Sequence, residues 1–462
     1  MKHAASFRDP AGFVFEHRGR LLRQVNAAGV ADYDSLMQSG LYEQLTGQHL
    51  LIPHREVEIE GLPPDADRRL VIEPDRVRTI SYPYEWGFSQ LQDAALTTLA
   101  VQAEALRHGL TLKDASAYNI QFHEGRPLLI DTLSFEKYTP SSPWAAYRQF
   151  CQHFLAPLAL MSQVDVDLGK LLLVHLDGVP LPLAAKLLPR RARLSPGLAM
   201  HLFLHARAQS RTPQAASAAG PGSHRRLSQS GLEGLVDSLT RTVRGLRWRG
   251  GKTEWGDYYN ATNYSATAFE HKQAVVASFL DEVRPQTVWD LGANTGQFSR
   301  LAGDRGIHTV SFDIDPVAVE ANYRLVRDRR EPNILPLLLD LTNPSPAIGW
   351  ANAERSSLAQ RGRADLVMAL ALVHHLAISN NLPLASIAAY FAALGRHLVV
   401  EFIPKSDSKV QILLATRPDI FPDYTMAGFE RAFAQHFQIV KKLPVKNSER
   451  TLYLMENLME KA

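Results

Sequence analysis

Apolar and polar positions follow two different patterns along this chain. In the second half, short apolar runs are followed repeatedly by small or acidic residues and then by helical spacing. This order is typical of buried parallel strands that alternate with helices. We therefore expect an α/β domain with a doubly wound, Rossmann-like sheet. Its strands are predicted at residues 288–291, 308–314, 337–339, 365–371 and 397–405, with a closing antiparallel pair at 437–440 and 451–455.

The first half mixes β-rich runs with longer amphipathic stretches, so we predict a separate α+β domain there. Two β-rich runs flank a polar His-Arg-Gly turn and predict a hairpin over residues 12–25. A helix over 89–107 is predicted by the apolar stripe at Leu91, Ala95, Leu99, Ala103 and Leu106. Further strands are predicted at 57–59 and 70–73, and further helices at 33–46, 144–160, 166–176, 181–188 and 196–208.

A change of composition separates the two halves. Residues 209–230 are rich in Ala, Ser, Gln, Gly and Pro, as flexible linkers are. We therefore predict domains at 1–208 and 231–462. An amphipathic helix begins after the linker and ends in several arginines, which we interpret as a solvated face. Because no aromatic residues interleave with these arginines, a nucleic-acid partner is not indicated.

Composition narrows the class of protein further. The chain has 462 residues, 45% hydrophobic and 21% charged, which is typical of a soluble globular protein of two domains. Its net charge of +3 does not indicate a nucleic-acid binder. One cysteine, Cys151, excludes an internal disulfide. The N-terminus lacks a signal-peptide pattern, and prolines and charges interrupt the most apolar stretch, so we expect a cytoplasmic protein without a membrane span.

The first strand of the second half ends in a glycine-rich turn that carries candidate chemistry. Asp290 is followed by Gly292, Asn294 and Gly296, and then by a helix. Glycine lets the backbone approach a bound nucleoside closely. Asp313, at the tip of the next strand, is placed to accept both hydroxyls of a ribose. A dehydrogenase is the alternative, but its Gly-x-Gly-x-x-Gly fingerprint around a pyrophosphate is not present.

These residues, together with Asp340 after the third strand, resemble motifs I, II and III of class I S-adenosylmethionine-dependent methyltransferases. The resemblance covers residues 255–462 and implies S-adenosylmethionine as the cofactor. It further implies that Asp313 binds the ribose and Asp340 the adenine amino group. Before the first motif, Tyr264, with Tyr258 and Tyr259, is a candidate lid over the cofactor, and Lys272 a candidate partner of its methionine carboxylate.

Three side chains near the strand ends are candidate general bases. His374 and His375 follow the fourth strand, and Glu401 lies at the tip of the fifth. An oxygen or nitrogen nucleophile is the expected acceptor. No Asn-Pro-Pro-Tyr signature follows the fourth strand, which argues against an exocyclic base amine. The whole chain resembles nodulation-associated methyltransferase-like proteins of bacteria, which implies a small-molecule, saccharide or lipid-linked acceptor.

The first half has its own chemical pattern. Asp114, Asn119 and Asp131 resemble the catalytic loop and metal-binding strand of protein-kinase-like phosphotransferases, where the first Asp orients a hydroxyl and the other two residues hold Mg²⁺ of Mg-ATP. The glycine-rich loop and the Val-Ala-Ile-Lys strand are missing, and Arg23 is a candidate for the place of the lysine. Three interpretations stay open: a phosphotransferase, a pseudokinase-like module that binds an acceptor or protein partner, and a surface without a ligand.

Overall fold

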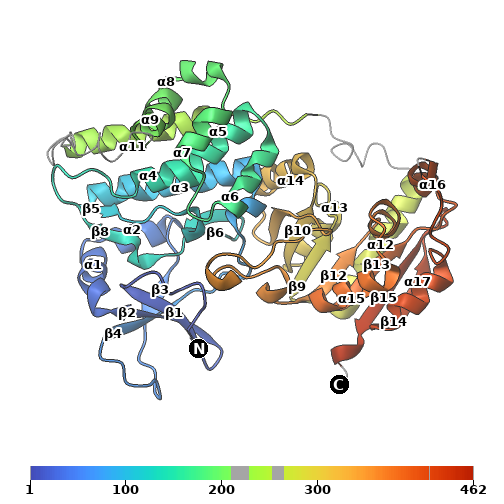
Figure 1. The fold of residues 1–462 in the computed structure, drawn as a ribbon. Helices are drawn as coiled ribbons and strands as arrows, with labels where there is room; N and C mark the ends of the chain where they lie inside the picture. The colour runs from blue at the N-terminus through green and yellow to red at the C-terminus, as the bar shows by residue number, and fades with distance from the viewer. Residues whose placement is uncertain (1, 210–227, 252–264, 416, 461–462) are drawn as a thin grey trace. The chain divides into compact units, whose positions relative to one another are not determined.

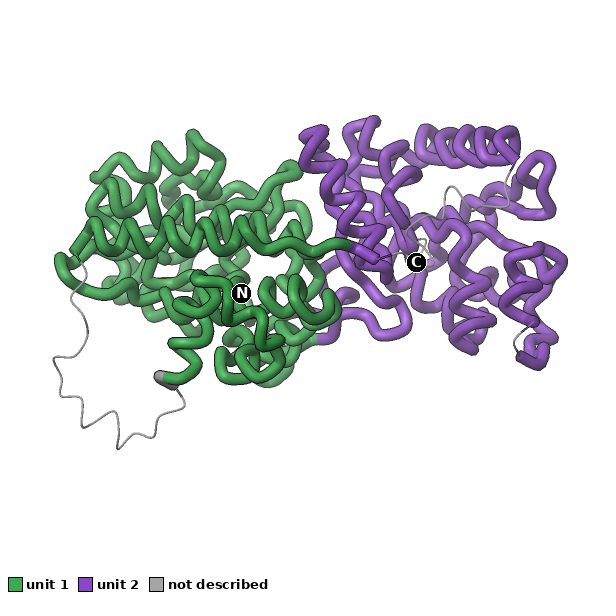
Figure 2. Tube along the Cα trace, turned by 90° about the horizontal axis from the view of Figure 1, so that it is seen from above, with its two compact units in different colours: residues 1–249, 347–355 green, residues 250–346, 356–462 purple. Residues whose placement is uncertain are grey.

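The computed structural model describes residues 2–209, 228–251, 265–415 and 417–460 (Figure 1). The chain forms two compact units, coloured separately in Figure 2. Unit 1 consists of Met1–Arg249 and Ala347–Arg355, and unit 2 of Gly250–Pro346 and Ser356–Ala462. Most of the predicted linker lies outside the described residues.

Unit 2 is built on one mixed sheet of seven strands in the order β11-β10-β9-β12-β13-β15-β14. The first five are parallel to one another, and β15 pairs antiparallel with both β13 and β14. This is the predicted doubly wound sheet with its closing antiparallel pair. The strands are β9 (Thr287–Leu291), β10 (His308–Asp313), β11 (Ile334–Leu338), β12 (Ala364–Ala369), β13 (Gly395–Phe402), β14 (Phe437–Pro444) and β15 (Thr451–Asn457).

The helices of unit 2 connect these strands and bury an apolar core against the sheet. That core joins side chains of α12 and α13 to those of the central strands, for example Phe279, Val288 and Leu366, each fully buried. The helices are α12 (Ala266–Val283), α13 (Gln297–Gly303), α14 (Pro316–Arg329), α15 (Leu384–Leu394), α16 (Ser408–Ala415) and α17 (Met426–Phe433). Short 3-10 or π-helical turns are η8 (Trp350–Asn352), which belongs to unit 1, and η9 (Ala359–Arg361), η10 (His375–Ser379) and η11 (Leu458–Glu460).

The strand order of unit 2 reverses between β9 and β12. From β9 the chain adds β10 and then β11 on one side, whereas β12 joins the other side of β9. Ligands of doubly wound sheets bind beyond the carboxyl ends of the strands at such a reversal. The turns that follow β9 and β12 are therefore the place to look for a site.

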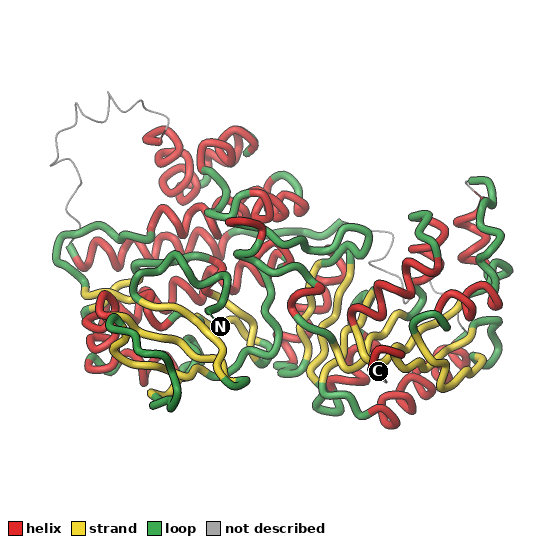
Figure 3. The backbone as a smooth tube through the Cα atoms, turned by 60° about the horizontal axis from the view of Figure 1, so that its bottom comes forward, coloured by secondary structure: helices red, strands yellow, loops and turns green. Residues whose placement is uncertain are grey.

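Unit 1 combines a four-stranded sheet, two small antiparallel strand pairs and a group of helices. Figure 3 shows most of its helices gathered on one side of its strands. The four-stranded sheet has the order β1-β2-β4-β3. Its strands are β1 (Gly12–His17), β2 (Arg20–Asn26), β3 (His54–Glu56) and β4 (Arg68–Pro74), and the smaller pairs are β5 (Leu110–Leu112) with β8 (Phe135–Lys137) and β6 (Ile120–His123) with β7 (Arg126–Leu129).

The elements of unit 1 differ from the predicted ones at one helix and one strand. The helix predicted over 33–46 is two helices, because Gly40 between them has a φ of 76°. The strand predicted at 57–59 is instead β3, a few residues earlier. The helices are α1 (Ala27–Gln38), α2 (Leu41–Gly47), α3 (Phe88–Arg107), α4 (Tyr147–Phe150), α5 (Ala156–Gln163), α6 (Leu171–Val174), α7 (Leu181–Leu187), α8 (Pro196–Leu198), α9 (His205–Gln209) and α11 (Gln229–Gly245), with short turns η1 (Pro83–Glu85), η2 (Ala117–Asn119), η3 (Thr132–Ser134), η4 (Cys151–Leu155), η5 (Val166–Lys170), η6 (Arg190–Leu194) and η7 (Ala199–Leu204).

The first correction to the predicted domains concerns α11. The sequence assigned it to the second domain, from residue 231, but it packs on α3 and α8 and belongs to unit 1. Its apolar stripe is buried there, at Leu232, Val236, Leu239 and Val243. The observed boundary is therefore after Arg249.

The second correction is a hairpin, Ala347–Arg355, that lies between β11 and β12 in the sequence but belongs to unit 1. An antiparallel bridge closes its base. Glu354, 3% exposed, accepts two hydrogen bonds from the Arg8 guanidinium, at 2.7 and 2.9 Å. The Arg355 guanidinium lies 4.3 Å from the centre of the Tyr118 ring. The hairpin Ala347–Arg355 is thus part of unit 1, although it lies between two strands of unit 2 in the sequence.

Among the described residues, none of the helices is both long enough and apolar enough to cross a bilayer.

Candidate functional site

The turn between β9 and α13 has a backbone that its sequence explains. Gly292, Asn294 and Gly296 have φ values of 76°, 51° and 78°. A Cβ on Gly296 would lie 2.5 Å from the Oδ1 atom of Asn322, so only glycine fits there. Asparagine is the residue that most often joins glycine in the left-handed region, because its short amide bonds locally. The departure from glycine at Asn294 is therefore compatible with the turn.

Asp313 ends β10 and faces this turn. The backbone N–H of Asn294 donates a hydrogen bond of 2.7 Å to its Oδ2 atom, and the N–H of Asp315 donates one of 2.9 Å to Oδ1. Burial raises the pKa of Asp313 to about 6, although these two bonds oppose the shift. The carboxylate is thus fixed in place while each oxygen keeps a lone pair for a ligand.

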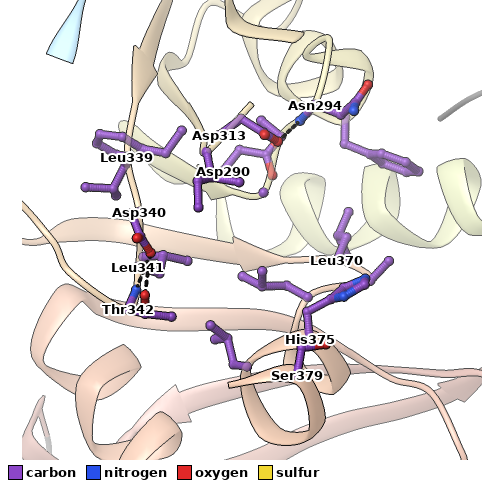
Figure 4. Close-up of a pocket in the computed structure, with 18 of the residues that line it drawn as sticks. Asp290, Asn294, Asp313, Leu339, Asp340, Leu341, Thr342, Leu370, His375 and Ser379 are labelled. Carbon is purple, nitrogen blue, oxygen red and sulfur yellow. Dashed lines mark hydrogen bonds between the residues drawn. The ribbon is translucent and has the colours of Figure 1, made fainter. Parts of the chain in front are cut away.

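Asp290, at the end of β9, is more deeply buried. It is 2% exposed and accepts a hydrogen bond of 2.6 Å from the Ser299 hydroxyl. Burial raises its pKa to about 7, and the neighbouring charge of Asp313 adds to the rise. Two carboxyl groups with raised pKa values therefore lie next to each other (Figure 4). A cationic ligand group would relieve the burial of both.

Lys272 and Glu401 form an ion pair below this region. The Lys272 Nζ atom lies 2.8 Å from Glu401 Oε2, and the two side chains are 3% and 0% exposed. The same oxygen accepts a hydrogen bond of 2.9 Å from the N–H of Ala371, whose φ is 51°. Burial lowers the pKa of Lys272, and Glu401 opposes that shift. Glu401 therefore fixes both α12 and the turn after β12.

These elements enclose a cavity of about 380 Å³ in unit 2. It lies beyond the carboxyl ends of β9 and β12, where the strand order reverses. Of the predicted site residues, the structure brings together along its wall Lys272, Asp290, Gly292, Asn294, Asp313, Asp340 and His375. Gly296, His374 and Glu401 do not line it, and Tyr258, Tyr259 and Tyr264 lie outside the described residues.

The two predicted histidines differ in their access to the cavity. His375 begins the π-helical turn η10 and lines the cavity, whereas His374 is 3% exposed and is not among the lining residues. Their ring centres are 4.0 Å apart. Burial lowers the pKa of His375 to about 4 and also lowers that of His374. Both imidazoles are therefore neutral near pH 7, and the lowered pKa makes His375 a weak base.

The far edge of the cavity is built by the residues after β11. Asp340 accepts hydrogen bonds from the N–H and the hydroxyl of Thr342, at 2.8 and 2.6 Å (Figure 4). Thr342, Ser379 and Asn380 also line the cavity, and the sequence analysis did not single them out. Their position after the third and fourth parallel strands is the signal that identifies them, since such turns share one edge of the sheet.

In unit 1, the predicted polar residues also converge. The Arg23 Nη1 atom lies 2.6 Å from Asp131 Oδ1, and its Nη2 atom lies 3.1 Å from Asp9 Oδ2. Burial and the charge of Asp131 raise the pKa of Asp114, and a hydrogen bond with Asn119 opposes this rise. Arg23, Asp114, Asn119 and Asp131 thus form one polar centre.

This centre does not fit a magnesium ion as it stands. The Asp131 Oδ1 atom already meets the Arg23 guanidinium and accepts a hydrogen bond from the Leu133 N–H. The Asn119 amide donates to the Ser134 hydroxyl at 3.3 Å. Among the described residues, no group of three or more His, Cys, Asp or Glu side chains is arranged to hold a metal. The Arg23 guanidinium therefore already pairs with the carboxylate that would have to bind the cation.

Comparison with known proteins gives one strong relative. The nodulation protein NoeA of Rhizobium meliloti (strain 1021) is 38% identical over 459 residues, which cover 98% of this chain and 95% of the relative. No protein-family model matches the chain. The likeness to NoeA extends over both units.

Solved structures resemble the chain only weakly. The magnesium protoporphyrin IX methyltransferase ChlM of Synechocystis PCC 6803 is 16% identical, with a TM-score of 0.31 over 43% of this chain and 90% of its own. The bifunctional kinase-methyltransferase WbdD is 16% identical, with a TM-score of 0.28 over 41% of this chain and 39% of its own. The chain thus spans less than half the length of WbdD. Because these TM-scores are low, the fold assignment rests on the strand order of unit 2 described above.

Proposed function

The chain belongs to the family of the nodulation protein NoeA, and we propose that it is a methyltransferase that uses S-adenosylmethionine to methylate an oxygen or nitrogen nucleophile. The observation that carries this proposal is the position of Asp313 and Asp290 beside the glycine turn, in a cavity at the reversal of the sheet. That arrangement suits a nucleoside that also carries positive charge. When bound, S-adenosylmethionine supplies a methyl group that its sulfonium has already activated.

The residues of the cavity divide the work of binding. Asp313 accepts the ribose hydroxyls, and Asp340 lies at the edge assigned to the adenine. Asp290 places negative charge near the cationic part of the ligand. Because Lys272 is paired with Glu401, we assign it to the electrostatic balance of the cavity floor as well as to the methionine carboxylate. These contacts orient the donor and exclude water, which is most of what methyl transfer requires of a protein.

A base for the acceptor proton is also present. His375 is the favoured candidate among the three predicted, because it is neutral and lines the cavity. His374 and Glu401 act behind the wall, as positioning residues. In a pH profile of kcat at saturating S-adenosylmethionine, where protonation of Asp290 and Asp313 no longer limits binding, His375→Gln removes the limb near pH 4 if this assignment is right and leaves it in place if another group is the base.

We propose a saccharide or another small molecule, free or lipid-linked, as the acceptor. The support is the name of the relative NoeA, a nodulation protein, and the sequence Leu372-Val373-His374-His375 where base-amine methyltransferases carry Asn-Pro-Pro-Tyr. The proposed site of action is the cytoplasm. Isothermal titration of S-adenosylmethionine into the full-length protein tests the activity itself, and absence of binding would exclude it.

Binding of S-adenosylmethionine is expected to depend on pH. Asp290 and Asp313 have pKa values of about 7 and about 6, and a cationic ligand favours their ionised forms. Affinity therefore rises as the pH increases, by about tenfold from about pH 6 to about pH 8. Titration calorimetry at several pH values checks this, and Asp290→Asn is the control with a much flatter profile. An affinity that falls with increasing pH would contradict the assignment.

For unit 1 we propose a pseudokinase-like module that binds the acceptor or a protein partner. The supporting observation is the Arg23–Asp131 ion pair, which engages the carboxylate that a phosphotransferase would need for its metal. Titration of Mg-ATP into the wild-type protein is therefore expected to give no binding heat, and Asp131→Ala is expected to behave in the same way. Mg-ATP binding that is lost in Asp131→Ala would instead favour a second, phosphotransferase activity.

A further inference from the structure

The charges of unit 1 are distributed unevenly along its sequence. Between Asp177 and Glu233 the chain contains no aspartate or glutamate. The described part of this stretch carries five basic residues, all exposed: Lys186, Arg190, Arg191, Arg193 and Arg207. Since the whole chain has a net charge of only +3, this concentration of positive charge is local.

Large apolar side chains are exposed in the same stretch. Leu194 is 83% exposed, Leu204 61%, Met200 52% and Leu187 42%. These exposed side chains are additional to the hydrophobic core, because each element also buries other apolar residues. Examples are Leu181 in α7, Ala192 in η6 and Leu202 in η7.

The four elements that carry these side chains pack on one another. α7 contacts η7 and α9, and η6 contacts η7 and α8. Within η7, Met200 and Leu204 are four residues apart, which places them on one side of the helix. The Arg193 guanidinium lies over the Phe203 ring, 5.2 Å from its centre, so an arginine is fixed next to this helix. The exposed basic and apolar side chains of residues 186–207 thus lie on neighbouring elements, and we call this set the basic apolar surface.

We propose that the basic apolar surface binds the surface of a membrane that contains anionic lipids. Leucine and methionine side chains enter the boundary between headgroups and acyl chains, and nearby arginines bind the lipid phosphates. A nucleic acid is the poorer fit, because exposed leucines gain nothing from contact with a phosphate backbone and the Phe203 ring, which could stack on a base, is covered by Arg193. The proposal is one of attachment, and none of these elements spans the bilayer.

Vesicle flotation with the full-length protein tests the proposal. The probes are vesicles of phosphatidylcholine alone and of equal parts phosphatidylcholine and phosphatidylglycerol. We expect the protein to float with the mixed vesicles at low salt, with at least about tenfold less bound to the neutral ones. Binding should weaken strongly at about 1 M NaCl, where the Debye length is about 3 Å.

Two double variants separate the contributions. Leu194→Ser with Leu204→Ser removes the inserting side chains, and Arg190→Gln with Arg191→Gln removes charges. Each is expected to lower the bound fraction roughly tenfold, because each arginine near an anionic surface and each buried apolar group contributes. All four positions are exposed, so circular dichroism should be unchanged. The matched control is Val174→Ser with Arg126→Gln, also exposed and in the same unit, which should bind like the wild type.

Several outcomes would overturn the proposal. Equal binding to neutral and anionic vesicles is one of them, and so is no binding to either. A third is loss of binding in the control variant to the same extent as in the two test variants. Binding of single-stranded RNA that competes with the mixed vesicles and is unaffected by the leucine variant would assign the surface to nucleic acid instead.

Discussion

Replacing Lys272 by methionine is expected to lower the free energy of unfolding of unit 2 by about 3–5 kcal/mol, because it leaves Glu401 buried without its cation. Glu401 is 0% exposed, so water cannot take the place of the ammonium group. The difference in stability between the variant and the wild type should become smaller at low pH, where Glu401 takes up a proton. Native-state hydrogen exchange of the amides in β9 and β13 measures this unit separately from the other.

The second member of the pair provides the control. Lys272→Met combined with Glu401→Gln removes both charges and keeps an oxygen for the N–H of Ala371. Most of the lost stability should therefore return. Lys441→Met breaks an exposed ion pair with Glu282 and should change stability by less than about 1 kcal/mol. A double variant as unstable as the single one would show that the charge of Lys272 is not what matters.

Asp313→Ala is expected to weaken S-adenosylmethionine binding by at least about 100-fold. The carboxylate provides two charge-assisted hydrogen bonds to the ribose, each worth about 1.5–3 kcal/mol. The variant also removes the acceptor for the N–H groups of Asn294 and Asp315, so the turn itself loses support. Isothermal titration measures the affinity, and circular dichroism establishes that the protein stays folded.

Two further variants make this result specific. Asp313→Asn keeps one oxygen acceptor and should bind with intermediate affinity. Asp328, at the exposed end of α14, has no role in the cavity, so Asp328→Ala should bind like the wild type. Unchanged binding in Asp313→Ala would remove the main support for the proposed nucleoside site, because among the described residues no other carboxylate accepts a hydrogen bond from the N–H of Asn294.

The sheet of unit 2 could be predicted because each strand and the turn after it are encoded by consecutive residues. Each strand is an apolar run, and each turn after a strand carries small or acidic residues, so Asp290, Asp313 and Asp340 were expected at one edge. The partnership of Lys272 with Glu401 could not be predicted in this way. Both residues were assigned separately to ligand or catalysis, because sequence spacing gives the end of a strand but not which side chains meet behind it.

The assignment of α11 shows a second limit. Its apolar stripe correctly predicted an amphipathic helix, but such a stripe shows only that one face is buried and not against which partner. The preceding linker composition suggested that the next domain had begun. In the structure α3 and α8 cover the stripe. The hairpin Ala347–Arg355 had no periodic pattern, and its membership of unit 1 depends on one ion pair and one ring contact with residues distant in sequence.

The hairpin Ala347–Arg355 also limits where the gene for this protein can be divided. A single cut between the units would leave the first without Glu354 and Arg355, and the second with a polar hairpin evolved for another surface. Fission into two genes at a point between the units would separate Arg8 from Glu354 and Tyr118 from Arg355. The two units should therefore be inherited, lost and recombined together, as a single evolutionary unit.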